Sequence, residues 1–129
     1  MTLLELRDKL DYSFILLRRN ADVLEYEALF PAQARMTEEL KEELRKHKPE
    51  LLQALEFEEE ADRLLLESTR RLAADWPEGC ALSGPPWEVT EEELRLAYRS
   101  TDRGRLEKAI EAREQYAAEA FREYRRVTP

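Results

Sequence analysis

The sequence predicts an α+β fold that is mostly helical. A helix–hairpin–helix–helix module is expected over residues 1–56, followed by a helical extension over residues 57–129. Three observations lead to this prediction. Two strand-like stretches flank a short run of turn residues, which indicates a single β-hairpin. Apolar residues elsewhere recur at helical spacing. A proline falls at a point where one helix must end and another begin.

A helix and a strand should open the chain. Leu3, Leu6 and Leu10 lie on one stripe at helical spacing, so we expect an amphipathic helix over residues 3–10. Residues 12–19, YSFILLRR, contain an unbroken run of aromatic and branched residues. Such a run favours a β-strand.

A turn and a second strand should complete the hairpin. Residues 20–22, Asn-Ala-Asp, include two residue types that tolerate left-handed backbone and bond their own main chain. Residues 23–29 then place Val, Glu and Glu on one side and Leu, Tyr and Ala on the other. This alternation is typical of a half-buried strand, and Pro31 should end it.

The next stretch predicts two helices and the joint between them. Thr37 can cap the first helix by accepting a backbone hydrogen bond, and Leu40 and Leu44 give this helix an apolar edge. The residue before a proline is disfavoured in the α region, whereas proline itself suits the first turn of a helix. A long second helix should therefore start at Pro49 and continue to about residue 75.

A loop and two further helices are expected in the remainder. Residues 76–89 are rich in Gly and Pro, which predicts a loop. Thr90 and Glu93 have the spacing of a capping box and should open the next helix. That helix should end near residues 101–104, where Gly104 can terminate it. Apolar residues then recur on one face over residues 105–126, which indicates a final helix.

Charge and composition exclude several classes of protein. The chain has 21 Lys and Arg against 29 Asp and Glu, a net charge of −8, which argues against broad binding of nucleic acid or of anionic membranes. No apolar run approaches a membrane span, and the N-terminus is too charged for a signal peptide. A single cysteine, Cys80, allows no internal disulfide, so we expect a cytoplasmic protein. The charged content of 39% is typical of heat-adapted, ion-pair-rich proteins, although high-GC coding produces it too.

No catalytic residue, metal site or cofactor is predicted. His47 is the one histidine, so sites that need two imidazoles are excluded, and we expect it to bond backbone groups at the helix joint. Cys80 has no base near it in sequence. The glutamates of residues 56–60 lack the spacing of a calcium loop, and the scattered glycines cannot form a phosphate loop. We therefore expect a protein that is not an enzyme.

One set of residues in the first 56 forms a recognisable pattern. It consists of the threonine and leucine of a short helix, the His-Lys pair after it, a Leu-Leu pair, leucines near the N-terminus and a strand–turn–strand, namely Thr37, Leu40, His47, Lys48, Leu51, Leu52, Leu3, Leu4, Leu6 and residues 14–26. On this pattern, residues 1–56 resemble the TubC-type N-terminal docking domain. The chain departs from that family where the family usually has glycine: at residues 11–12, 20–22 and 31–33.

The resemblance implies a fold and a function. It implies the order helix, strand, strand, helix, helix, and docking of an extended segment of another protein along the hairpin. Members of the family also dimerise. Similar modules occur in stand-alone proteins of plasmids and other mobile elements, and the length of this chain suggests that second setting.

The hairpin is the predicted partner-binding site. A two-stranded sheet leaves both edges unpaired, and such an edge can accept an added strand. Arg18 and Arg19 would favour acidic residues in the added segment. The alternative is that a second copy of the chain, or the C-terminal helices, cover the edge. The predicted partner-binding residues are Phe14, Leu16, Arg18, Arg19, Val23, Glu25 and Tyr26.

The long helix predicts a homodimer. Its apolar face is longer than residues 1–56 can bury, and each buried leucine side chain is worth roughly 1.5–3 kcal/mol, so exposure would be costly. Coverage by the C-terminal helices of the same chain is the monomeric alternative. The predicted self-association residues are Phe57, Ala61, Leu64, Leu65 and Leu72.

A competing hypothesis is a nucleic-acid-associated accessory factor of a plasmid, phage or mobile-element replication system. It would use the arginine pairs at residues 18–19, 70–71 and 125–126. These pairs would have to converge on one face against a negative background. Salt bridges to the many glutamates are the simpler interpretation.

Overall fold

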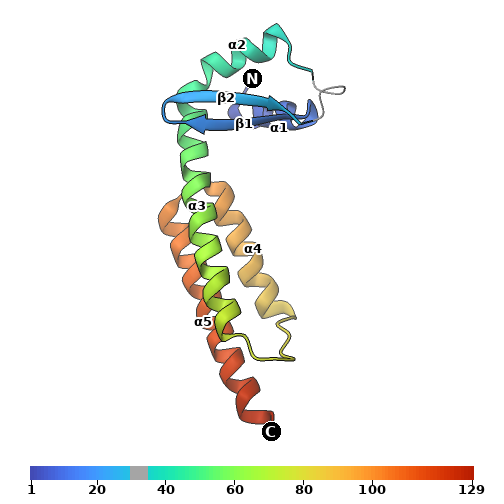
Figure 1. Ribbon diagram of the computed structural model, residues 1–129, viewed down its shortest axis with the longest axis vertical. Coiled ribbons are helices and arrows are strands. Elements are labelled where there is room, and N and C mark those ends of the chain that lie inside the picture. The colour runs from blue at the N-terminus through green and yellow to red at the C-terminus, as the bar shows by residue number, and fades with distance from the viewer. Residues whose placement is uncertain (30–34) are drawn as a thin grey trace. The chain divides into compact units, whose positions relative to one another are not determined.

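The computed structural model describes residues 1–29 and 35–129. Within these residues the chain has five helices and one two-stranded antiparallel sheet (Figure 1), which confirms the mixed, mostly helical fold. The predicted strand end at Pro31 lies outside the described residues. The elements are α1 (Leu3–Tyr12), β1 (Ile15–Asn20), β2 (Val23–Ala28), α2 (Glu38–Lys46), α3 (Lys48–Asp75), α4 (Pro85–Ser100) and α5 (Arg103–Val127).

The described residues divide into two compact units, Met1–Glu56 and Phe57–Pro129. The first unit contains α1, the hairpin, α2 and the start of α3. One apolar cluster holds these elements together. Each element contributes at least one buried aliphatic side chain to it, except β2, whose Leu24 is half-buried. The buried members of the cluster are Leu6, Leu10, Ile15, Leu40, Leu44 and Leu51.

The hairpin has an inward and an outward face. Residues directly opposite each other in an antiparallel pair share a face, and the register pairs Ile15 with Ala28 and Arg19 with Leu24. Ile15 is buried and Leu24 half-buried, so this is the inward face. Leu16 and its neighbours on the other face are exposed. The alternation predicted for residues 23–29 is only partly present, because Leu24 is half-buried but Tyr26 and Ala28 are exposed.

Two details of the hairpin differ from the prediction. β1 begins at Ile15 and not at Tyr12, because α1 continues through Tyr12 and Phe14 has left-handed backbone with φ of 57°. At the turn, the residue with left-handed backbone is Ala21, with φ of 52°, and neither Asn20 nor Asp22. An alanine in this region is strained by its Cβ.

The joint between α2 and α3 lies at His47. Thr37 caps α2 as predicted, since its Oγ1 accepts a hydrogen bond of 3.2 Å from the Leu40 backbone N–H. α3 begins at Lys48, one residue before the predicted start. The buried His47 ring places Nε2 2.9 Å from the Met1 carbonyl oxygen. This contact ties the N-terminus to the joint and agrees with the structural role expected for the histidine.

The second unit packs α4 and α5 with residues 57–75 of α3. Its core uses small residues where the helices approach closely and leucines between them. Trp76, at the end of α3, lies with its ring centroid 5.0 Å from that of Phe121 and 6.5 Å from that of Trp87. The buried residues of the unit are Ala61, Ser68, Leu72, Leu94, Ala97, Leu106, Ala109, Ile110, Ala117 and Phe121.

The predicted loop over residues 76–89 and the predicted capping box at Thr90 are wrong, because α4 begins earlier than expected. α4 begins at Pro85, so the loop after α3 is shorter than residues 76–89. Proline suits this position because the first turn of a helix leaves its N–H groups unpaired in any case. Thr90 is therefore already inside the helix, where its hydroxyl donates a 2.7 Å hydrogen bond to the Trp87 carbonyl.

The junction between α4 and α5 lies where it was predicted, but Gly104 does not form it. α4 ends at Ser100, and Thr101 follows with left-handed backbone at φ of 55°. Gly104 lies in the first turn of α5 and does not end α4. The cap of α5 is Asp102, whose Oδ1 accepts a 3.1 Å hydrogen bond from the Arg105 N–H.

Across residues 1–29 and 35–129, no helix is both long enough and apolar enough to span a membrane.

Candidate functional site

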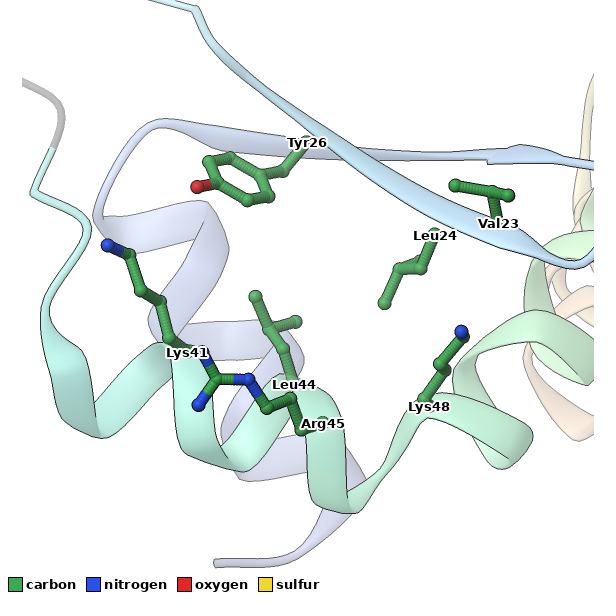
Figure 2. Close-up of a pocket in the computed structure, with 7 residues that line it drawn as sticks. All are labelled: Val23, Leu24, Tyr26, Lys41, Leu44, Arg45 and Lys48. Carbon is green, nitrogen blue, oxygen red and sulfur yellow. The ribbon is translucent and has the colours of Figure 1, made fainter.

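A groove of about 280 Å³ lies between β2 and α2 in the first unit (Figure 2). We call it the basic groove. Its walls combine aliphatic side chains, one tyrosine and three cationic side chains, and come from β2, α2 and the first residue of α3. The lining residues are Val23, Leu24, Tyr26, Lys41, Leu44, Arg45 and Lys48.

The positive charge of the basic groove comes from both sides of the α2–α3 joint. Lys41 and Arg45 are four residues apart in α2 and so lie on one face of that helix, and Lys48, the first residue of α3, lines the same groove. Lys41 has a carboxylate partner, Glu38, at 3.2 Å. In the part of the chain that the structure describes, Arg45 and Lys48 have none. The groove therefore holds two cations that no local carboxylate neutralises.

The bottom of the basic groove is apolar. Leu44 is buried and Leu24 is half-buried, and Figure 2 shows the two side chains pointing toward each other between the strand and the helix. Tyr26 is 50% exposed and carries a hydroxyl that can donate or accept a hydrogen bond. The groove can thus contact both an apolar and a negatively charged group.

The free edge of β2 runs beside the basic groove. The Leu29 N–H donates a 2.9 Å hydrogen bond to the Phe14 carbonyl, which sets the alternation of the ladder. Alternate residues of an antiparallel pair turn their main-chain groups toward the partner strand. The main-chain groups of Leu24 and Tyr26 consequently point away from β1. Within residues 1–29 and 35–129 no strand pairs with this edge.

The seven predicted partner-binding residues do not form one surface. Only Val23 and Tyr26 line the basic groove. Phe14 precedes the first strand. Of the others, the register places Leu16, Arg18 and Glu25 with Val23 on the outward face, and Arg19 with Tyr26 on the inward face.

The strand arginines are not the source of free positive charge. Arg18 forms an ion pair with Glu27 on β2, and the Arg19 guanidinium donates a 3.3 Å hydrogen bond to the Ala21 carbonyl. The cations of the basic groove were missed by the sequence analysis, which treated residues 37–55 only as helices and a joint. The four-residue spacing of Lys41 and Arg45 could have indicated that these two cations share one face of a helix.

The predicted self-association residues are covered within one chain. Ala61 and Leu72 are 0% and 7% exposed. Phe57, Leu64 and Leu65 are half-buried against the cluster that α4 and α5 complete. The C-terminal helices thus cover Ala61 and Leu72 fully and the other three residues in part, as the monomeric alternative expected. This coverage weakens the argument for a dimer, and the dimer itself stays a prediction.

The arginine pairs of the nucleic-acid hypothesis are largely occupied by carboxylates. A hydrogen bond from Arg71 to Glu114, 2.7 Å long, raises the pKa of the guanidinium and keeps it charged and paired. The other ion pairs of these arginines are Arg18 with Glu27, Arg125 with Asp75 and Arg126 with Glu123. This pattern agrees with the simpler interpretation of the pairs.

No protein-family model, curated protein or solved structure matches the chain. Among the residues described here, no three His, Cys, Asp or Glu side chains lie close enough together to hold a metal ion. We therefore base the function on the geometry of the basic groove.

Proposed function

We propose that residues 1–56 form a non-enzymatic, cytoplasmic docking module that binds an extended, acidic segment of a partner protein along the free edge of β2. The observation that carries this proposal is the combination of an unpaired strand edge with the unneutralised cations Arg45 and Lys48 in one groove. Main-chain hydrogen bonds to the edge would supply affinity, and the groove would supply selectivity.

The spacing of the cations suits a partner in strand conformation. Side chains on one face of a strand repeat about every 6.6–6.8 Å. Residues four apart in a helix, such as Lys41 and Arg45, are separated by about 6 Å along the helix axis. A partner with acidic residues at alternate positions could therefore place successive carboxylates against successive cations.

The apolar bottom of the groove adds a second element of recognition. Leu24 and Leu44 would accept an aliphatic side chain of the partner, and the exposed Tyr26 would bond its carboxylate or main chain. A purely acidic segment would leave this apolar surface in water. The preferred partner segment thus combines acidic and aliphatic residues.

We also propose that this unit is a TubC-type docking domain. The element order α1, β1, β2, α2, α3 supports that assignment, as does the cap at Thr37. Docking of this kind requires no second copy of the chain. The alternative, an accessory factor that binds nucleic acid, has weaker support because its arginine pairs are occupied by carboxylates.

A peptide titration tests the proposed function. The probe is a fluorescent peptide of alternating Asp and Val, followed by anisotropy and by shifts of the Leu24 and Tyr26 amide signals. Arg45→Glu removes an ion pair with the peptide, worth about 0.2–1 kcal/mol, and adds repulsion of similar size, so binding should weaken roughly two- to thirtyfold. Lys46→Glu makes the same charge change outside the groove and should have a smaller effect.

Two controls can refute the proposed docking. A peptide of the same length and the same number of Asp residues, but with proline at every third position, cannot pair with the strand edge, so it should bind poorly. Equal binding of both peptides, or equal effects of the Arg45 and Lys46 variants, would refute docking in the groove. Salt-sensitive binding of DNA in place of the peptide would favour the nucleic-acid alternative.

A further inference from the structure

A second cleft, of about 380 Å³, lies within the second unit, Phe57–Pro129. It is lined by side chains of α3, α4 and α5 and includes three arginines, Arg95, Arg99 and Arg113. We call it the arginine cleft. Three arginine residues therefore line one cleft of a chain whose net charge is −8.

Arg113 is the most desolvated of the three cations. Its side chain is 17% exposed, and its guanidinium carbon lies 5.1 Å from the centroid of the Trp87 ring. Glu91 Oε1 is 3.1 Å from Arg113 Nε, but the two atoms are not aligned for a hydrogen bond, and Nε is buried without one. Because Nε is buried, an anion in the cleft would bond the other N–H groups of the Arg113 guanidinium, which make no hydrogen bond within the described residues.

The other two arginines come from one face of α4. Arg95 and Arg99 are four residues apart, so their side chains are neighbours on the helix. Glu92 accepts a 3.0 Å hydrogen bond from Arg95 Nε and holds that side chain in place. Arg99 has no carboxylate within ion-pair distance in the described part of the chain. Glu91 and Glu92 together carry two negative charges and the three arginines carry three positive charges, so the cleft has a net positive charge.

Phosphate fits this arrangement better than carboxylate does. A phosphate monoester carries about −1.5 to −2 charge at neutral pH and three acceptor oxygens, enough to address three guanidinium groups. The Thr69 hydroxyl adds a further donor, and Leu65 and Leu94 provide apolar surface beside it. The volume is within the range of roughly 300–1,000 Å³ that is usual for small-molecule sites.

We propose that the arginine cleft binds a small phosphate monoester, with the phosphate held by Arg95, Arg99 and Arg113 and an apolar body against Leu65 and Leu94. This site is separate from the basic groove, and it stands whether or not the first unit docks a peptide.

Calorimetry with phenyl phosphate as the probe tests the site. Saturable binding is expected, and loss of one charge-assisted contact in Arg99→Gln should weaken it about tenfold. Arg122→Gln, an exposed arginine of α5 outside the cleft, makes the same charge change and should leave binding unchanged. Benzoate should bind more weakly than phenyl phosphate, and inorganic phosphate should too because it has no apolar body.

Three results would refute the proposed phosphate site. The first is the absence of saturable binding of phenyl phosphate. The others are equal losses of affinity in the Arg99 and Arg122 variants, and benzoate binding as tightly as phenyl phosphate. Amide shifts confined to residues 23–48 would place the ligand in the basic groove and would also refute the cleft. Both variants change exposed side chains, so thermal melts should show that they remain folded.

Discussion

Leu72→Ala should destabilise the second unit and leave the mass of the protein unchanged. Leu72 is 7% exposed and packs with Ala117 and Phe121 in one apolar cluster. If the apolar face of α3 were instead a seam between two chains, the same change would separate the chains and spare the fold. The neighbouring Leu66, which is 50% exposed, provides the matched control.

The size of the effect follows from the burial of Leu72. Truncation to alanine removes three buried carbon atoms, and at ~0.8 kcal/mol each the lost transfer free energy is about 2.4 kcal/mol. The residual cavity adds to this, so the free energy of unfolding should fall by about 3 kcal/mol. For a unit of this size the melting temperature should then fall by roughly 12–24 °C.

Thermal melts followed by circular dichroism, and light scattering at several protein concentrations, measure the two quantities. Leu72→Ala should melt well below the unaltered protein at every concentration, with the same mass. Leu66→Ala should stay within about 0.5 kcal/mol of the unaltered protein. A Leu72→Ala protein that keeps its melting temperature but halves its mass would refute the coverage of α3 by α4 and α5.

Three further outcomes are expected. Ala21→Gly should raise the free energy of unfolding by about 0.5–1 kcal/mol, because φ of 52° strains alanine but not glycine; a urea melt without any gain would contradict this. Thr37→Ala should cost about 1 kcal/mol as a lost helix cap, whereas Thr90→Ala should cost clearly less, and equal losses would contradict the observed helix starts. A hydrogen bond from Arg63 lowers the pKa of Glu60 below its usual 4.5, so its contribution to stability is complete above that pH and is lost as pH falls through the lowered pKa. Acid melts should therefore show a decline that is shallower in Glu60→Gln and in high salt, and an unchanged slope would count against this ion pair.

Much of the fold could be predicted because its signals are local. Thr37 has the chemistry of a cap and uses it, and the proline at residue 49 marks the α2–α3 joint to within one residue. The start of α4 was mispredicted because the Pro-Pro pair at residues 85–86 serves equally in a loop and in a first helical turn. Gly104 was mispredicted because Thr101 accepts left-handed backbone that glycine usually provides.

The candidate site was harder to predict because its parts are distant in sequence. Tyr26 and Lys41 come from different elements, and only the folded chain brings β2 beside α2. The prediction placed the positive charge on Arg18 and Arg19, but Arg18 forms an ion pair with Glu27 of the neighbouring strand. Glu27 is distant from Arg18 in sequence, so this pairing could not be predicted before the register of the hairpin was known.

The basic groove gives an acidic partner two opposed electrostatic environments. Far from the surface the partner meets the field of a chain with net charge −8 and is repelled. Next to Arg45 and Lys48 it is attracted, over distances shorter than the Debye length of about 8 Å at physiological ionic strength. Free acidic chains should consequently encounter the groove slowly. A segment that another contact already holds nearby escapes this barrier, so the groove suits a tethered partner better than a diffusing one.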